Sequence, residues 1–590
     1  MANADLHNLR HSLAHLLAAS VLELFPDAKL GIGPTIEHGF YYDFLLPRPL
    51  TPADLPKIQK VIRKKISQDL RFERQELSEA QAKALFVTQP FKLELIRDLV
   101  TKGTTVFDEL EKTGGAPSAT ITAYKTGNFV DLCRGGHVAS TKSLPADAFA
   151  LTHTAGAYWR GSEKNPMLQR VYGVAFASKA ELDAYLKLQV EIKKRDHRKL
   201  GADLELFSFD PAAPGAPFWH PKGMVVVREL EKLVREKLDA AGYQEISTPQ
   251  LVRKDLWEKS GHWQHYRENM FRLTVDEQEY ALKPMNCPEA TLVYATHTRS
   301  YRDLPLRFAE FGRLFRNELS GALGGLLRVR QLTMDDAHVF CRPDQIETEV
   351  TALLTLVKGL HALFGFRPTF ALATMPADHL GTEATWRDAE AKLAAALKRN
   401  RLAYTVKDKD GAFYGPKIDI HIQDALGRSW QLSTIQLDYQ LPEKFNLSYV
   451  AKDGSAQPPV MIHRALLGSF ERFIGILTEH VAGAFPLWLA PVQVAVIPVG
   501  LKHEKACQKL GKELQAAGLR VEVFTADQSV GKSIRTAEKQ KLPYMLVIGD
   551  KEMRSPKLHV RERGKEKLAT VAKKAFISSM LKKVNTRSRS

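Results

Sequence analysis

Residues 306–341, LRFAEFGRLFRNELSGALGGLLRVRQLTMDDAHVFC, place the strongest constraint on what this chain can fold into. They predict a strand, a Gly-rich loop and a returning strand. Arg316 and Glu318 would share one face of the first strand, because side chains two residues apart point the same way. The second strand would carry Arg328 and Arg330, followed by Asp335, Asp336 and His338. An antiparallel pair with these side chains is a poor core and a good site for a phosphate, an amine and a metal; a solvated charged hairpin is the alternative.

The composition is that of a globular protein with several domains. The chain has 590 residues, of which 44% are hydrophobic and 26% charged, and this length predicts about three to five domains. The formal net charge of +17 favours a polyanionic partner, nucleic acid first. The 4 cysteines are scattered, which argues against a disulfide framework.

The sequence also predicts where the protein works. No apolar run approaches the length needed to span a bilayer, so we expect no membrane association. The N-terminus starts polar, carries histidines and lacks a clear cleavage site. We therefore expect a cytoplasmic protein without a signal peptide.

The first region, residues 1–180, contains a candidate metal or hydrolytic site. HSLAHLL predicts an amphipathic helix with His11 and His15 one turn apart on one face. DLCRGGH adds Cys133 and His137. These four groups could bind Zn²⁺, or they could position water in a hydrolytic pocket. A third interpretation is a pair of helix histidines beside a buried thiol.

The rest of the chain predicts three further segments. Residues 181–200 form a charged helical connector, and its basic end is typical of a solvated face. After residue 201 the composition changes, and VVVRELEKLVREKLDAAGYQEISTPQLV predicts a long amphipathic helix, a Gly stop and a strand. Residues 490–590 alternate strands and helices, which is typical of a small mixed sheet covered by helices.

Three sets of motifs together extend along essentially the whole chain. A long helix leading to a strand with Pro249, FRNE at 315–318 and GSFERF at 468–473 resemble the three signature motifs of class II aminoacyl-tRNA synthetases. KPMNCP, DDAHVFC, FYGPKIDI, WQLSTIQLDYQLP and MIHRALLGSFERFIGILTEH narrow the resemblance to the threonyl family. HSLAHLL, DLCRGGH and TAGAYWRG resemble the same family in the first region.

The resemblance implies a multidomain protein of α/β and α+β class that forms a homodimer. A class II catalytic domain, with an antiparallel sheet flanked by helices, would follow an α+β editing domain and precede an α/β anticodon-binding domain. The implied segments are editing domain 1–180, helical linker 181–200, catalytic domain 201–489 and anticodon-binding domain 490–590. The chain begins at the editing region, so we expect it to lack the small ubiquitin-like TGS domain that many bacterial relatives carry first.

The implied activity is that of a ligase that activates threonine with ATP and transfers it from threonyl-adenylate to tRNA(Thr). The family's Zn²⁺, one per subunit, would be held by Cys287, His338 and His463. Three ligands leave open positions for an amino group and a β-hydroxyl, whereas an apolar pocket separates threonine poorly from valine. The resemblance also places Asp336 at the substrate hydroxyl and Tyr414 near the amino acid.

The resemblance assigns the activation step mainly to arginines. Arg316 would clamp the α-phosphate and the carboxylate of threonine, since a guanidinium fork suits both. Glu318 would place the adenine amino group, and Arg472 would hold the γ-phosphate. Mg²⁺ would bridge the phosphates of ATP. Three more residues would line this pocket: Arg328, Lys417 and Gln431.

Two further sites follow from the resemblance. Serine carries the same amino and hydroxyl groups as threonine, so the zinc site alone would not exclude it. The first region resembles the family's editing domain, which hydrolyses Ser-tRNA(Thr), and this favours the hydrolytic interpretation over the metal. The editing site would comprise His11, His15, Asp131, Cys133 and His137. The anticodon bases would be read by Glu552 and Arg561; exposed charges in a basic domain are the alternative.

Several positions depart from the family's pattern. Leu319 and Gly324 stand where Pro and His are usual, in a loop that approaches the tRNA acceptor end in relatives. Met334 replaces a Gln whose hydrogen bonds it cannot make.

Two other functions compete with a threonyl enzyme. A proline or serine enzyme is disfavoured by the Cys/His/His set, and a non-catalytic tRNA-binding paralogue is disfavoured by the intact Arg316 and Arg472.

Overall fold

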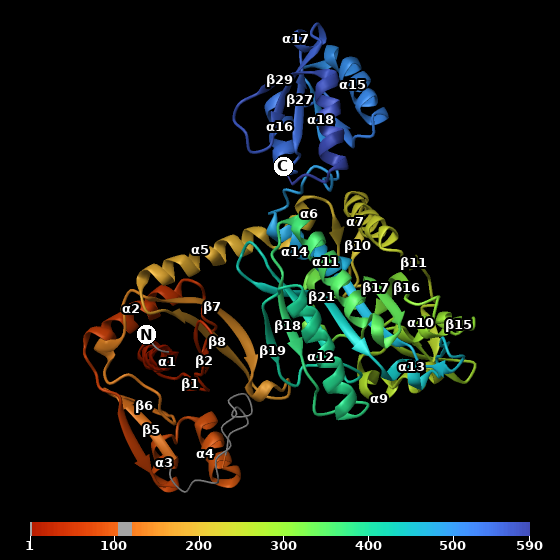
Figure 1. The fold of residues 1–590 in the computed structure, drawn as a ribbon. Coiled ribbons are helices and arrows are strands. Elements are labelled where there is room, and N and C mark those ends of the chain that lie inside the picture. Colours follow the sequence, from red (N-terminus) through yellow and green to blue (C-terminus); the bar gives the residue numbers. More distant parts are fainter. Residues whose placement is uncertain (1–2, 104–120, 590) are drawn as a thin grey trace. The chain divides into compact units, whose positions relative to one another are not determined.

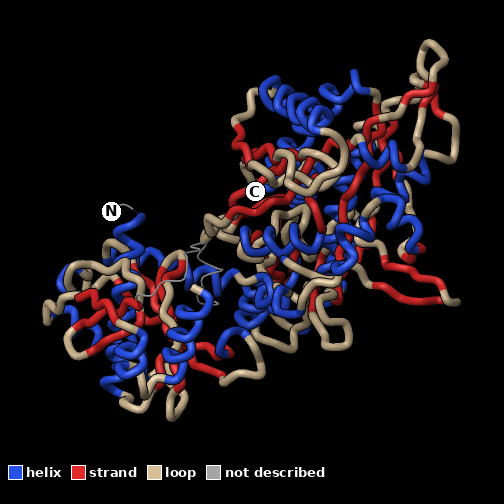
Figure 2. The backbone as a smooth tube through the Cα atoms, turned by 90° about the horizontal axis from the view of Figure 1, so that it is seen from below, coloured by secondary structure: helices blue, strands red, loops and turns tan. Residues whose placement is uncertain are grey.

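The computed structural model describes residues 3–103 and 121–589. The chain divides into two compact units, residues 1–190 and 191–590. Figures 1 and 2 show that each unit combines helices with strands. Among the described residues, no helix has the length and apolar character needed to cross a membrane.

The first unit contains two antiparallel sheets. The larger has the order β1-β3-β8-β7 with β2 beside β3, and the smaller has the order β4-β5-β6. Helix α1 (Asn3–Leu24) contacts β3 and α2 (Asp54–Ser67) and forms one apolar core with them. The other elements of this unit are β1 (Lys29–Leu30), β2 (Thr35–Ile36), β3 (Gly39–Leu45), β4 (Glu73–Leu77), α3 (Glu79–Leu85), α4 (Pro90–Lys102), β5 (Ile121–Thr126), β6 (Phe129–Leu132), β7 (Phe149–Tyr158) and β8 (Met167–Ala175).

Helix α1 is buried more completely than an amphipathic helix would be. Every residue from Ser12 to Val21 is buried. The amphipathic pattern predicted for this helix is therefore wrong over its central turns, because the unit packs against all sides of it. His15 lies within this buried stretch and His11 lies just before it.

Two helices stand where the charged connector was predicted. α5 (Lys179–Arg195) covers most of residues 181–200, and α6 (His197–Asp203) follows it. The Asp196 side chain accepts a hydrogen bond from the backbone N–H of Arg198 and so caps α6. The domain boundaries at residues 180, 200 and 489 stay predictions.

The second unit is organised around an eight-stranded sheet with the order β11-β16-β17-β24-β21-β20-β18-β19. Its inner strands are all antiparallel, and only the β11/β16 and β18/β19 pairs are parallel. The strands are β11 (Gln244–Glu245), β16 (Leu306–Phe315), β17 (Gln331–Cys341), β18 (Thr369–Ala373), β19 (Tyr404–Lys407), β20 (Lys417–Gln423), β21 (Ser429–Asp438) and β24 (Val460–Ser469).

Four long helices share the apolar core of this sheet. They are α7 (Pro221–Ala240), α11 (Ile346–Phe364), α12 (Glu383–Arg399) and α14 (Phe470–His480). An antiparallel sheet flanked by helices is the expected catalytic fold, and Figure 1 shows α11, α12 and α14 beside it. The predicted long helix that ends near a Gly and leads to a strand is also present, as α7, Gly242 and β11.

The hairpin of residues 306–341 is present with one correction. β16 ends at Phe315 and β17 begins at Gln331, where the two residues pair. Arg316 and Glu318 therefore do not share a face of the first strand as predicted. Arg328 and Arg330, predicted on the second strand, also lie in the connecting segment. The strand stops because the chain turns back, with the Glu318 N–H donating to the Arg316 carbonyl at 2.8 Å. Two 3₁₀ turns follow, η5 (Ser320–Ala322) and η6 (Gly325–Leu327).

The C-terminal part of this unit is a mixed sheet covered by helices, as predicted. Its order is β26-β25-β27-β28-β29, with the first three strands parallel and the rest antiparallel. The elements are β25 (Val494–Pro498), α15 (Glu504–Ala516), β26 (Val521–Val523), α16 (Val530–Lys539), β27 (Tyr544–Ile548), α17 (Asp550–Met553), β28 (Lys557–Glu562), β29 (Ala569–Ala572) and α18 (Lys573–Asn585).

Short elements complete the second unit. They form three small sheets, β10-β9, β12-β14-β13 and β15-β22-β23, together with four short helices. Their bounds are β9 (Phe207–Ser208), β10 (Phe218–Trp219), β12 (Leu251–Arg253), α8 (Lys254–Ser260), α9 (His262–Tyr266), β13 (Arg272–Val275), β14 (Gln278–Leu282), α10 (Cys287–Tyr294), β15 (Arg299–Ser300), α13 (Gln440–Lys444), β22 (Tyr449–Val450) and β23 (Ala456–Gln457).

Candidate functional site

Cys287, His338 and His463 converge in the second unit, although they lie far apart in the sequence. One ligand atom from each lies within 4.8 Å of the others, and all three side chains are buried. The two histidines are neighbours because His338 of β17 pairs with His463 of β24. Cys287 is the first residue of α10. A thiol and two imidazoles that meet in this way are a donor set suited to Zn²⁺.

A carboxylate lies close to each of the two histidines. The Asp438 Oδ2 atom lies 2.9 Å from His463 Nε2, an arrangement that proteins use to fix the tautomer of a metal-binding histidine. The Asp336 Oδ2 atom accepts a hydrogen bond from Asn286 Nδ2 at 3.0 Å and lies 3.8 Å from His338 Nε2. The predicted hydroxyl acceptor, Asp336, is thus beside the cluster.

Burial shifts the pKa of two members of this cluster, His338 and Cys287. It holds the pKa of His338 well below the ordinary value, with the nearby His463 adding to the effect. It raises the pKa of the Cys287 thiol well above the ordinary value, with Asp336 adding to the effect. A bound cation reverses this preference for the neutral thiol, because a coordinating thiol is deprotonated. The residues present therefore fit a metal ion with neutral imidazole ligands and one thiolate.

Two other side chains complete the surroundings of the cluster. The Tyr414 hydroxyl donates to Gln436 Oε1, and its ring centroid lies 5.1 Å from that of His463. His262 is buried, and its Nε2 atom lies 3.8 Å from Cys287 Sγ. Sequence reasoning missed His262, whose only signal was its place in the aromatic stretch GHWQHY.

A second pocket collects the predicted phosphate-binding residues. Its lining includes Arg316, Glu318, Arg328, Gln431 and Arg472. The Arg328 guanidinium lies 2.8 Å from the Glu318 carboxylate. Burial lowers the pKa of Arg472, and the positive charges of Arg316 and Arg328 lower it further. Three guanidinium groups that repel one another in one pocket are suited to a polyphosphate ligand.

The structure places the remaining predicted pocket residues around one buried carboxylate. Asp419 accepts a hydrogen bond from Gln431 Nε2 at 2.6 Å and binds Lys417 Nζ at 2.8 Å.

The three positions that depart from the family's pattern lie in two different surroundings. Met334 lies in the lining of the arginine pocket. The other two departures are open to solvent, since the Leu319 side chain is 80% exposed and no atom within 4 Å would meet a Cβ at Gly324.

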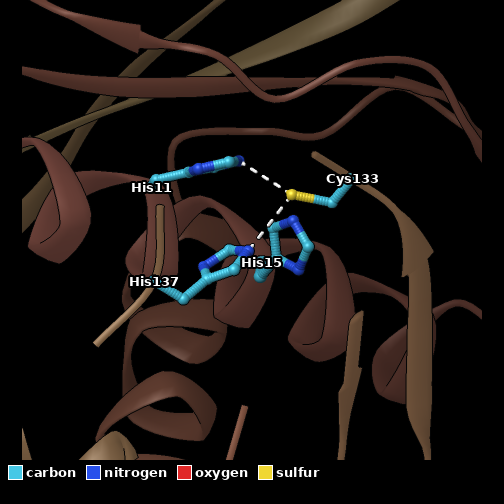
Figure 3. A group of neighbouring side chains, drawn as sticks. All are labelled: His11, His15, Cys133 and His137. Atoms are coloured by element: carbon cyan, nitrogen blue, oxygen red, sulfur yellow. Dashed lines mark hydrogen bonds between the residues drawn. The ribbon is translucent and has the colours of Figure 1, made fainter. Parts of the chain in front are cut away.

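The first unit holds the second predicted cluster, shown in Figure 3. His11 and His15 project from α1, and Cys133 and His137 follow β6. One ligand atom from each lies within 4.8 Å of the others. The Cys133 Sγ atom lies 3.5 Å from His11 Nε2 and 3.2 Å from His137 Nε2.

Asp131 links this cluster to groups that the sequence did not reveal. Its carboxylate lies 4.0 Å from His15 Nε2. Lys92 Nζ binds it at 2.6 Å, and the Tyr42 hydroxyl donates to it at 2.5 Å. Lys92 and Tyr42 are both buried and come from α4 and β3, so nothing in their local sequence pointed to this contact.

Burial also keeps the first unit's cluster neutral near pH 7. It lowers the pKa of His11 to about 4 and that of His137 to about 2. It raises the pKa of the Cys133 thiol to about 12. A thiol with such a pKa is a poor nucleophile, because the thiolate is the reactive form. Neutral imidazoles and a thiol are instead suited to hold and orient a water molecule.

Glu552 and Arg561 lie on neighbouring elements of the C-terminal part, α17 and β28. The Glu552 side chain accepts a hydrogen bond from the Gly549 N–H at 2.9 Å and lies 2.6 Å from His559 Nδ1. Arg561 lies on β28, opposite Met545. The position of Glu552 is explained by its role in capping α17, so an anticodon role for either residue stays a prediction.

Three segments of the chain match known domain families. Residues 121–172 match the threonyl and alanyl tRNA synthetase second additional domain. Residues 271–481 match the tRNA synthetase class II core domain of the G, H, P, S and T enzymes. Residues 493–583 match the anticodon binding domain.

Curated relatives and a solved structure agree with these matches. The threonine–tRNA ligase of Thermotoga maritima is 51% identical over 582 residues, which are 98% of this chain and 88% of that protein. The threonine–tRNA ligase of Desulforamulus reducens is 50% identical over 573 residues, covering 97% and 87%. The RNA binding domain of threonyl-tRNA synthetase from Cryptosporidium parvum has a TM-score of 0.63 and 42% identity, covering 66% of this chain and 98% of that one. This chain belongs to the threonine–tRNA ligase family of class II aminoacyl-tRNA synthetases.

Proposed function

We propose that this threonine–tRNA ligase selects threonine at the Cys287, His338 and His463 cluster and activates it in the neighbouring arginine pocket. The observation that carries the proposal is that β17 contributes His338 to the cluster and Met334 to the pocket. One strand thus links an amino-acid site to a nucleotide site. The family's reaction needs both, because the carboxylate of threonine attacks the α-phosphate of ATP and displaces pyrophosphate.

The three cluster residues would hold one Zn²⁺ per subunit. When bound, the ion supplies positive charge and open coordination positions that suit an amino group and a hydroxyl. Asp336 would accept a hydrogen bond from the threonine hydroxyl, which valine lacks. Tyr414, whose hydroxyl already donates to Gln436, would lie beside the bound amino acid.

The arginine pocket would bind ATP with Mg²⁺, which class II synthetases require. Arg316 would bind the α-phosphate and the threonine carboxylate, and Arg472 would bind the γ-phosphate. Each charge is in place before the substrates arrive, so little reorganisation is needed when the phosphorus centre gains negative charge. Glu318 would accept a hydrogen bond from the adenine amino group, and it also orients Arg328 through their ion pair at 2.8 Å. Lys417 and Gln431, both bound to Asp419, would border the substrates.

The first unit's cluster would hydrolyse Ser-tRNA(Thr). His11, His15, Cys133 and His137 would position a water molecule at the ester, with their imidazoles neutral because burial lowers the pKa of His11 to about 4. Asp131 would orient His15. The poor ionisation of Cys133, with a pKa of about 12, favours direct attack by water over a covalent thioester.

The remaining proposals concern the assembly and its surroundings. Glu552 and Arg561 would contact the anticodon of tRNA(Thr), and the net charge of +17 supports a nucleic acid partner. The protein would act as a homodimer in the cytoplasm. Sedimentation that returned the mass of a single chain at micromolar concentration would contradict the homodimer, and fractionation with membranes would contradict the location.

The metal content of the purified protein tests the zinc proposal directly. We expect about one Zn²⁺ per chain in the unmodified protein and almost none in Cys287→Ala, since three ligands are needed for a stable site. Cys341→Ala is the matched control, because Cys341 is also buried and free but stands apart from the cluster. Equal zinc in both variants would contradict the assignment.

A further inference from the structure

His197 is a buried histidine whose two ring nitrogens are both engaged, and none of the roles above uses it. It is the first residue of α6, and its side chain is 2% exposed. Its Nε2 atom accepts a hydrogen bond from the Leu326 N–H at 3.0 Å. Its Nδ1 atom lies 2.6 Å from the Glu479 carboxylate.

These contacts define the protonation of the ring. A backbone N–H only donates, so Nε2 must carry the lone pair and Nδ1 must carry the proton. The imidazole is therefore neutral, with Nδ1–H donating to Glu479. Because both nitrogens are occupied, the Asp196, His197 and Glu479 group is not available as a metal site, although its ligand atoms lie within 4.8 Å of one another.

His197 binds Leu326, and Leu326 belongs to a turn that also contacts Arg472. Leu326 lies in η6 (Gly325–Leu327), and the carbonyl of the next residue, Leu327, accepts a hydrogen bond from Arg472 Nε at 2.9 Å. Leu327 and Arg472 both line the arginine pocket. One peptide unit therefore separates the group bound by His197 from the group that fixes the guanidinium.

The surrounding residues leave little freedom to this arrangement. Gly325 has φ +58, and a Cβ at this position would lie 2.2 Å from His197 Nε2, so the close approach of the ring requires a glycine. Glu479 is fixed in turn by Arg428, which binds its other carboxylate oxygen. Glu479 and Arg472 lie at opposite ends of the same helix, α14. The His197 ring thus connects η6 to α14, the helix that carries Arg472, through one hydrogen bond to each.

We infer that His197 is a positioning residue for the ATP site, because its neutral ring holds the 325–327 turn whose carbonyl orients Arg472. The inference rests on the proposed function of Arg472 as a ligand of the ATP phosphates. His197 itself contacts no substrate. Its loss should weaken ATP binding and leave threonine binding unchanged, since none of the hydrogen bonds described for residues 325–327 involves Cys287, His338 or His463.

Two substitutions separate the contacts of the ring. His197→Asn keeps a donor near Nδ1 for Glu479 but removes the acceptor for the Leu326 N–H, which would leave a buried donor unpaired. We expect the KM for ATP in pyrophosphate exchange to rise about tenfold, with the KM for threonine unchanged. His197→Gln places an amide oxygen near the position of Nε2 and should restore the KM for ATP to within about threefold of the unmodified enzyme.

A matched control distinguishes positioning from general destabilisation. His361 is also fully buried, with its Nε2 atom 2.7 Å from Ser433 Oγ, and this hydrogen bond involves neither η6 nor Arg472. His361→Asn should lower the melting temperature without changing the KM for ATP. If His361→Asn raised this KM as much as His197→Asn, the effect would be one of stability and the inference would be overturned.

The double variant tests whether His197 acts through Arg472. The dissociation constant of ATP, measured by equilibrium dialysis, should rise in Arg472→Ala, and adding His197→Asn should raise it no further. Additive effects of the two substitutions would overturn the inference while leaving the role of Arg472 intact. An unchanged dissociation constant in Arg472→Ala would overturn the proposed function of Arg472 itself.

Discussion

Arg316→Ala is expected to lower threonine-dependent ATP–pyrophosphate exchange by about 10²- to 10³-fold, the loss seen when one preorganised donor to a transition-state charge is removed. Arg316 lines the pocket that also contains Arg328 and Arg472. Its guanidinium would contact the centre where negative charge develops, so kcat should fall more than the KM for ATP rises.

The control for this prediction is on the strand that precedes Arg316. Arg313 lies on β16 with an exposed side chain outside the pocket lining, and Arg313→Ala should retain nearly full exchange. The zinc content of Arg316→Ala should stay at about one ion per chain. Exchange within threefold of the unmodified enzyme in Arg316→Ala would contradict the role given to this residue.

His11→Ala and Cys133→Ala are expected to leave threonylation intact and to slow hydrolysis of Ser-tRNA(Thr) by about 10²-fold or more, as expected for lost positioning of a water molecule. The two side chains lie 3.5 Å apart within a cluster that holds all its members neutral. Ser-tRNA(Thr) should therefore accumulate when serine competes with threonine. The assay is the rate of deacylation of preformed Ser-tRNA(Thr).

His38→Ala is the matched control for the editing prediction. His38 belongs to the same unit but is exposed, and it is not a member of the cluster. The His38→Ala variant should deacylate Ser-tRNA(Thr) at the same rate as the unmodified enzyme. Cys133→Ser further tests the chemistry, because a hydroxyl can still hydrogen-bond to water; it should keep more activity than Cys133→Ala. Hydrolysis at full rate in both His11→Ala and Cys133→Ala would rule out the assignment.

Sequence reasoning succeeded where the signal was a periodicity or a specific motif. The hairpin of residues 306–341, the long helix α7 and the mixed C-terminal sheet were predicted from local patterns and are present. The zinc candidates came from the family resemblance alone. No spacing rule could join His338 to His463, because the contact depends on the register in which β17 pairs with β24.

Other features were missed because they arise only in the folded chain. Strand alternation was extended to Arg316 and Glu318, but β16 ends at Phe315, where the backbone turns back on itself. Lys92 and Tyr42 reach Asp131 from separate elements. These residue types occur at many surface and core positions, so only the tertiary structure identifies them as neighbours of the cluster.

The structure also bears on the three departures from the family's pattern. Met334 lines the arginine pocket, so it should affect the nucleotide more directly than the threonine side chain. Leu319 and Gly324 lie in an open stretch where a change of side chain meets few neighbours. None of the three removes a member of the Cys287, His338 and His463 cluster.

The most direct test of the central claim is ATP–pyrophosphate exchange with threonine, serine and valine, measured before and after removal of zinc by a chelator. We predict strong exchange with threonine, weaker exchange with serine, almost none with valine, and loss of all exchange without zinc until the ion is restored. Robust exchange with valine, or exchange with threonine that is indifferent to the chelator, would contradict selection of the amino acid at Cys287, His338 and His463.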